Sequence, residues 1–316
     1  MLWNLEMNPR PPTPDDLAGS VLAVPPLARR PDLSIDAAAN RALIRHIEAG
    51  GVRILLYGGN ANLYHQPVSE FGAMLSMLAD AAAPTSWVIP SIGPDYGKMI
   101  DQAALLRHSG FHTAMVLPMQ GVTSIEGVET GLRRASDAAG MPLTVYLRSE
   151  DYLSIDALGR LVDDGHVWCV KYAIGRSAGA HEDAFLDALV QRIGAARIVS
   201  GMGERPVLGH VGRVGRYGLP SFTTGGGCIA PRSCMALLAA LQAGQADRAR
   251  ELHARFMPLE GLRESLSLVR VLHDAVTWSG VADMGAQLPL LSPTPASMRA
   301  EVEAAACVLR RQDALL

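Results

Sequence analysis

The sequence predicts an α/β fold, a closed (β/α)₈ barrel of the TIM type followed by a C-terminal helical extension. Eight short apolar runs, typical of buried parallel strands, recur at intervals of about 20 to 35 residues. Between them lie stretches with helical periodicity, and such alternation implies a parallel sheet with helices packed outside it. Eight units over about 230 residues fit a barrel, which typically takes about 250 residues, better than an open sheet of five to seven strands.

The predicted strands are rich in Val, Ile and Leu and cover residues 20–24, 53–57, 86–92, 113–117, 143–147, 167–172, 197–200 and 221–224. Two of the intervening helices carry clear signals. Residues 34–50 place apolar side chains along one helical face and end at glycine. The segment 123–140 begins with Thr123 and Glu126 at the spacing of a capping box and ends on Gly140.

The pattern divides the chain into three regions. Residues 1–17 are an N-terminal extension, residues 18–235 form the barrel, and residues 236–316 form a C-terminal helical region. The Leu, Ala and Met stripes of the last region are typical of a helical core or a subunit interface. We therefore expect these helices to serve packing.

Composition and charge favour a small-molecule partner. A net charge of −3 without a basic run argues against nucleic acid and against an anionic membrane surface. No apolar stretch reaches the roughly 18 residues that a membrane helix needs, and the N-terminus lacks the order of a signal peptide.

The four cysteines show no metal-binding spacing, which favours a reduced, cytoplasmic setting. The nine histidines include no HxH or HExxH, so we expect neither a metal nor a cofactor.

Lys171, in the sixth predicted strand, is a charged residue in an otherwise apolar segment. It is one of only two lysines in the chain, and it lies in an apolar run although lysine is rarely fully buried. It stands near the carboxyl end of its strand, where barrel enzymes carry their chemistry. Strict alternation sets Lys171 on one face with Val167 and Cys169, and Trp168 on the other. If Trp168 packs under the outer helices, Lys171 points into the barrel mouth.

A lysine in that position can act as a nucleophile. Burial disfavours the ammonium and lowers the lysine pKa from about 10.4. The neutral amine can attack a ketone and form a Schiff base, whose iminium acts as an electron sink. The alternative is a lysine that extends from the strand end to pair with a carboxylate. Tyr146, inward-facing on the neighbouring strand, could transfer protons beside Lys171, although alone it would be read as an ordinary core residue.

Two glycine-rich loops follow strands whose ends meet at the same mouth. The loop after the second strand could offer main-chain N–H groups and an asparagine amide to a carboxylate. The loop after the eighth strand adds two threonine hydroxyls to an oxygen-rich substrate. Each could equally be a plain turn. The candidate binding residues on this rim are Gly58, Gly59, Asn60, Gly201, Thr223 and Thr224.

The runs "VWCVKYAIGR" and "TVYLRS" and the "GGNAN" loop resemble the dihydrodipicolinate synthase and N-acetylneuraminate lyase superfamily of Schiff-base lyases, over about residues 18–310. This resemblance implies that Lys171 forms the imine and that Tyr146 corresponds to the family's strand-five tyrosine. It also implies a homo-oligomer, a tetramer or a dimer.

Local details are similar to the 5-dehydro-4-deoxyglucarate dehydratase branch of that superfamily, in "GGNAN", "YLRSEDYLSIDALGRL" and "LPSFTTGGGCIAP". By this resemblance Asn60 contacts the substrate carboxylate, and Thr223 and Thr224 contact substrate oxygens. Arg148 is the matching arginine and a candidate anion anchor.

The leading hypothesis is a class I, metal-independent lyase that acts on a 2-oxo acid, a sugar-acid derivative. Aldol chemistry at a carbon–carbon bond and dehydration at a carbon–oxygen bond both remain open. The second hypothesis is a member that has lost catalysis and serves as a small-molecule binding or regulatory protein. It is motivated by Ala61 and Asn62, which stand where the family's loop has a glycine and a glutamate.

Overall fold

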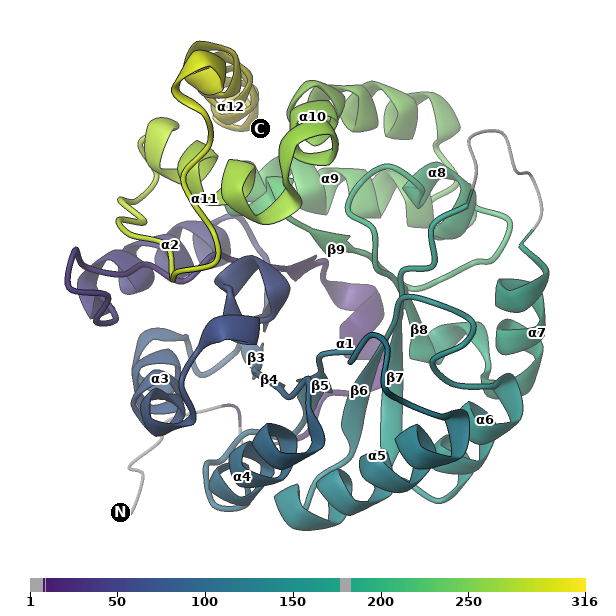
Figure 1. Ribbon diagram of the computed structural model, residues 1–316. Coiled ribbons are helices and arrows are strands. Elements are labelled where there is room, and N and C mark those ends of the chain that lie inside the picture. The colour runs from purple at the N-terminus through teal and green to yellow at the C-terminus, as the bar shows by residue number, and fades with distance from the viewer. Residues whose placement is uncertain (1–7, 9, 177–182) are drawn as a thin grey trace.

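Parallel strands form a closed ring in the computed structural model, which describes residue 8, residues 10–176 and residues 183–316 (Figure 1). One sheet has the order β3-β2-β1-β9 and the other the order β4-β5-β6-β7-β8. A parallel bridge between Ser200 and Phe222 joins the end of β8 to the segment before β9 and closes the ring. The predicted barrel is confirmed. The strands are β1 (Leu22–Ala23), β2 (Ile54–Leu56), β3 (Trp87–Ile89), β4 (Ser91–Ile92), β5 (Ala114–Val116), β6 (Leu143–Leu147), β7 (Val167–Tyr172), β8 (Ile198–Ser200) and β9 (Thr223–Thr224).

The third predicted strand is divided in two. Pro90 separates β3 from β4, and proline has no N–H to donate to a ladder. As a result β3 pairs with β2, whereas β4 pairs with β5. β3 and β4 follow one another in the place of a single barrel strand. The ring therefore has eight strand positions in the described chain.

Helices surround the ring (Figure 1). The cap predicted for α5 is wrong by one residue, because Ser124, not Thr123, accepts a hydrogen bond from the backbone N–H of Gly127. The predicted end at Gly140 is confirmed, in a left-handed conformation. The α-helices are α1 (Pro14–Gly19), α2 (Ala37–Ala49), α3 (Val68–Ala81), α4 (Tyr96–Leu106), α5 (Ile125–Ala139), α6 (Ile155–Asp163), α7 (Ala184–Ile193), α8 (Val207–His210), α9 (Pro231–Gln242), α10 (Ala246–Leu266), α11 (Leu268–Trp278) and α12 (Arg299–Asp313), and the 3₁₀ turns are η1 (Gly59–Ala61), η2 (Leu63–His65), η3 (Ala195–Arg197), η4 (Gly226–Cys228) and η5 (Ala296–Met298).

A bulge in β7 breaks the alternation that the sequence predicted. The register between β6 and β7 shifts next to Leu143, so Trp168 is an extra residue with no direct partner. Its indole N–H donates to the hydroxyls of Thr113 and Thr144, at 2.8 and 2.9 Å. Thr144 lies two residues before Tyr146 and shares its inner face. The expectation that Trp168 packs under the outer helices is therefore wrong.

Lys171 faces the barrel interior as predicted, but it does so because of the bulge, since unbroken alternation from Val167 would pair it with Leu147 instead of Tyr146. Beyond the bulge the register is regular, and Tyr146 pairs directly with Lys171. Val167 pairs with Leu143, whereas Cys169 pairs with Thr144, so the predicted shared face of Val167 and Cys169 is also wrong.

The C-terminal helices pack on the barrel and reach its carboxyl end. Helix α10 contacts α9 and η4, and α11 contacts η1, the turn that follows β2. Helix α9 runs without interruption across residues 235 and 236, while the division of the chain into three regions stays a prediction. Within residue 8, 10–176 and 183–316, no helix combines the length and the apolar character needed to cross a membrane.

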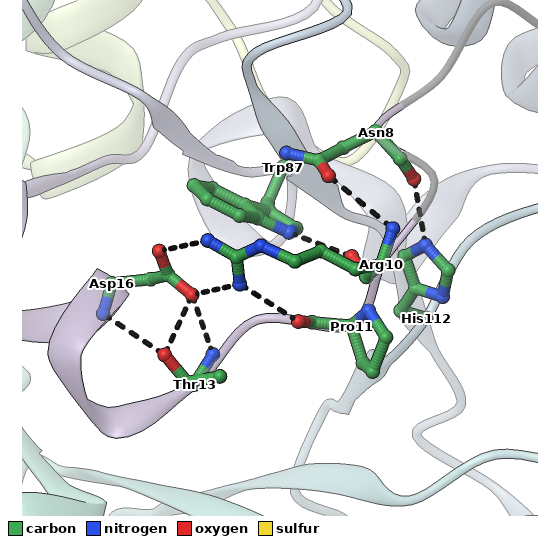
Figure 2. A network of polar contacts seen from close by, with 7 residues as sticks. All are labelled: Asn8, Arg10, Pro11, Thr13, Asp16, Trp87 and His112. Carbon is green, nitrogen blue, oxygen red and sulfur yellow. Dashed lines mark hydrogen bonds and ion pairs between the residues drawn. The ribbon is translucent and has the colours of Figure 1, made fainter.

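The N-terminal segment lies at the opposite, amino end of the strands (Figure 2). The Arg10 guanidinium donates to both carboxylate oxygens of Asp16, at 2.6 and 2.7 Å, and lies 4.9 Å from the centre of the Trp87 ring. Trp87, the first residue of β3, donates its indole N–H to the Arg10 carbonyl at 3.1 Å. His112, just before β5, contacts the carbonyl of Asn8 at 2.8 Å. Asn8 and Arg10 thus contact residues at the amino ends of β5 and β3.

The Trp168 bulge can be tested by Trp168→Phe. The substitution leaves two buried hydroxyls without their shared donor, so we expect the free energy of unfolding to fall by about 1–3 kcal/mol in urea denaturation. The matched control is Trp278→Phe, because the Trp278 indole N–H donates to none of the described residues. Equal losses in the two variants would contradict a special role for the Trp168 hydrogen bonds.

Candidate active site

A cavity of about 500 Å³ opens at the carboxyl ends of the strands. The loops after β2, β6, β7, β8 and β9 line it, together with residues of α10. Every site residue expected from the sequence lies on its wall except Thr224. Those on the wall are Gly58, Gly59, Asn60, Tyr146, Arg148, Lys171, Gly201 and Thr223.

Lys171 and Tyr146 form the centre of the cavity wall. They are direct partners on neighbouring strands, and the Lys171 Nζ lies 3.6 Å from the centre of the Tyr146 ring. Lys171 is 7% exposed and forms no ion pair with a carboxylate in the part of the chain that the structure describes. The alternative of a strand-end lysine paired with a carboxylate therefore finds no support in the described residues.

The electrostatic surroundings disfavour the ammonium form of Lys171. Burial lowers the pKa of Lys171 below its usual 10.5, and the positive charges of Arg148 and Arg263 add to this shift. The Tyr146 phenol opposes the shift in the pKa of Lys171 by charge and by a hydrogen bond. For Tyr146, burial alone would raise the pKa, but Lys171 and Arg148 together bring the phenol pKa below 10.0. The pair is thus poised to exchange a proton.

Arg148 follows β6 directly and extends over the same wall. Its guanidinium carbon lies 5.9 Å from the centre of the Tyr146 ring. Among the described residues it has no carboxylate partner, and its charge partly offsets the rise that burial causes in the pKa of the Tyr64 phenol. An exposed arginine without a carboxylate partner can take a substrate anion.

The loop after β2 is shaped by close packing. A Cβ on Gly58 would lie 2.7 Å from the Met115 Cε, so only glycine fits without a shift of that side chain. The amide of Asn60 donates to the Val24 carbonyl at 3.3 Å. Asn62 adopts a left-handed conformation and donates to the Leu288 carbonyl at 3.4 Å, which ties the loop to the C-terminal segment.

The two threonines of β9 have different surroundings. Thr223 lies on the cavity wall and donates to the Ser200 carbonyl at 3.4 Å. Thr224 is fully buried behind the wall, where its hydroxyl donates to a carboxylate oxygen of Glu204 and accepts from the Gly227 N–H. The Thr224 hydroxyl is therefore occupied by protein groups.

A cluster of charged groups, formed by Glu204, Glu260 and Arg263, lies beside this wall and was missed by sequence reasoning. Arg263 and Glu260, one turn apart on α10, form a buried ion pair. Both line the cavity, whereas Glu204 lies behind it with an exposed fraction of 0%. The Glu204–Glu260–Arg263 cluster brings the C-terminal region into the site.

The glycines after β9 make room for the Glu204–Glu260–Arg263 cluster. A Cβ on Gly225 would lie 2.4 Å from the Arg263 Nη1, and one on Gly226 would lie 2.8 Å from a Glu204 oxygen. The close approach of charged side chains thus accounts for Gly225 and Gly226, whereas a Cβ on Gly227 would lie 2.7 Å from Thr224.

The surroundings of Glu204 favour the protonated form of its carboxyl group. Burial is the main cause, followed by the charge of Glu260, and together they raise the pKa of Glu204 to about 8. Hydrogen bonding to Thr224 and the charge of Arg263 act in the opposite direction on that pKa. One of its oxygens has no partner within the described residues. Burial and the neighbouring Glu260 carboxylate therefore disfavour a second negative charge in the Glu204–Glu260–Arg263 cluster.

With the geometry in place, comparison with known proteins identifies the family. Residues 21–307 match the Dihydrodipicolinate synthetase family. The chain belongs to this family. The resemblance read from the sequence is confirmed at that level, whereas the dehydratase branch stays a prediction. A search of the curated proteins finds no match.

Solved structures share the fold of this dihydrodipicolinate synthetase family member at low identity. The dihydrodipicolinate synthase from Bacillus clausii is 20% identical, with 95% of this chain and 99% of that chain covered and a TM-score of 0.80. The sialic acid aldolase from Ruminococcus gnavus is 16% identical, with 95% and 99% covered and a TM-score of 0.80. At these identities the likeness shows the fold.

Sequence reasoning missed several wall residues of this family member because they come from distant segments. They include Arg205, Glu260, Arg263 and Glu264. The sequence does show that Glu260 and Arg263 are three residues apart, a spacing that allows an ion pair along a helix. Only the packing of α10 over the barrel mouth makes it part of the site. Among the described residues no group of His, Cys, Asp and Glu could hold a metal ion.

The protonated state of Glu204 predicts a pH dependence of stability. Its pKa in the fold, about 8, exceeds the usual 4.5, so its stabilising contribution is complete below pH 4.5 and is lost as the pH rises toward 8. Relative to Glu204→Gln, the wild-type free energy of unfolding should fall by up to about 1.4 kcal/mol per pH unit between pH 5 and 8. Urea denaturation at several pH values measures this difference. Glu264→Gln, at an exposed position, is the control, and identical pH slopes in wild type and Glu204→Gln would contradict a raised pKa.

Proposed function

We propose that this family member is a class I, Schiff-base-forming lyase that acts on a 2-oxo acid, a sugar-acid derivative. The observation that carries the proposal is the buried amine of Lys171 beside the Tyr146 phenol, without a carboxylate partner among the described residues. Family membership supports the same reaction class, because the chain matches the Dihydrodipicolinate synthetase family over residues 21–307.

Lys171 and Tyr146 would share the first steps of the reaction. The neutral amine adds to the 2-oxo carbon, and the resulting carbinolamine loses its oxygen as water to give an iminium. Tyr146 donates and takes back the protons that these steps require. Loss of a C3 proton or cleavage of the C3–C4 bond then leaves its electron pair in an enamine. The same enamine permits aldol chemistry or expulsion of a C4 hydroxyl, and we leave both open.

The substrate carboxylate would bind between Arg148 and the loop after β2. In that loop the N–H groups of Ala61, Asn62 and Leu63 already bond to carbonyls of the loop, so the N–H groups of Gly59 and Asn60 are the ones available at the start of the turn. Thr223 and Gly201 would contact substrate hydroxyls from the opposite rim. Thr224 would support this rim through Glu204, without direct contact.

We also propose a homo-oligomer, a dimer or a tetramer, in the cytoplasm. A groove of about 980 Å³ between α4 and α5 lies apart from Lys171 and carries Val122, which is 90% exposed. Such an apolar surface is typical of a subunit contact. The four cysteines are all free, as in a reducing compartment.

Trapping of the imine tests the reaction class. Incubation with pyruvate and a panel of 2-oxo acids, followed by borohydride reduction, should give a mass adduct on Lys171 and none in Lys171→Ala. Tyr146→Phe should form the adduct about 10²–10⁴-fold more slowly, because proton transfer is lost. Lys98→Arg, which changes the only other lysine, should trap like the wild type.

An absence of adduct with every 2-oxo acid would overturn the proposal. An adduct that forms without turnover of any sugar acid would instead favour the binding or regulatory protein.

A further inference from the structure

Arg263 offers an unused donor to the cavity. It is 3% exposed, yet it lines the cavity that contains Lys171. Its Nη1 donates to Glu260 and its Nε to the Leu268 carbonyl at 3.3 Å. The Nη2 group donates to no residue in the described ranges. A buried guanidinium with a free edge on a cavity is a site for an anion.

The guanidinium of Arg263 is held in one position from several sides. Glu260, one turn before it on α10, fixes one edge through the buried ion pair. The backbone of Gly225 lies against its flat face, since a Cβ there would be within 2.6 Å of three guanidinium atoms. Because its side chain is already fixed, Arg263 loses less conformational entropy when an anion binds.

Arg148 and Arg263 lie on either side of Lys171 around the ring. Arg148 follows β6, and Lys171 is on β7. Arg263 rests against Gly225, which follows β9, and its partner Glu260 lies against Gly203, which follows β8. The two cations therefore face the reactive amine from opposite directions, and a 2-oxo acid needs only one of them for its carboxylate.

We infer that Arg263 binds a second anionic group of the substrate, such as a carboxylate, at the end remote from the 2-oxo acid group. This inference rests on the proposed function and narrows it to dianionic 2-oxo acids. Arg205, also on the wall, pairs with Glu264 at 2.7 Å on the exposed rim and is less suited to this role. Arg263 is thus a specificity-determining residue supplied by the C-terminal region.

Imine trapping with a matched pair of probes tests the inference. 2-Oxoglutarate carries a terminal carboxylate, and 2-oxopentanoate has the same chain length without it. In the wild type we expect half-saturation of the Lys171 adduct at a concentration about tenfold or more lower for 2-oxoglutarate. Arg263→Gln should abolish this preference, measured as the ratio of the two half-saturation concentrations within the variant.

Two further variants control for the fold. Arg263→Lys keeps a charge for Glu260 but not the guanidinium fork, so it should lose most of the preference and remain measurable if Arg263→Gln does not fold. Arg250→Gln, on the exposed face of α10, should keep the wild-type preference.

The outcomes separate this inference from the reaction class. A wild-type adduct with pyruvate but no preference for 2-oxoglutarate, or a preference that survives Arg263→Gln and Arg263→Lys, would overturn the role of Arg263. Failure of the wild type to trap pyruvate and every other 2-oxo acid would overturn the Schiff-base proposal itself.

Discussion

The burial of the Lys171 amine is the constraint on which the site depends. Burying an ammonium without an opposite charge costs free energy. Where no carboxylate lies close by, burial therefore shifts the equilibrium toward the neutral amine. Here the nearest partner is the Tyr146 phenol, and the charged neighbours Arg148 and Arg263 are themselves positive. The direct pairing of β6 with β7 fixes Tyr146 beside Lys171, because paired residues on parallel strands share a face.

The C-terminal helices extend this arrangement beyond the barrel. Helix α10 carries Glu260 and Arg263 to the mouth, and the glycines after β9 leave space for them. Burial favours the protonated form of Glu204, and in that form it lies beside Glu260 without a second negative charge. The acidic groups near the cavity are in this way paired or neutral, which keeps a carboxylate from stabilising the Lys171 ammonium.

Local patterns predicted most of the fold and the centre of the site. The eight strand positions, and the places of Lys171 and Tyr146 near strand ends, follow from apolar runs and their spacing, which are local properties. The bulge at Trp168 could not be predicted, because it depends on hydrogen bonds to Thr113 and Thr144 on other strands. Arg263 was missed for a related reason: its role depends on how α10 packs over the mouth.

Burial lowers the pKa of Lys171, so a larger share of its amine is neutral at a given pH than in an ordinary lysine. Since the chain has only two lysines, NMR of protein labelled with ¹³Cε-lysine gives two side-chain signals, and Lys98→Arg assigns them. We predict that the Lys171 signal titrates below 10.5, because burial disfavours the ammonium. A Lys171 signal that stays that of an ammonium up to pH 10.5 would contradict the account.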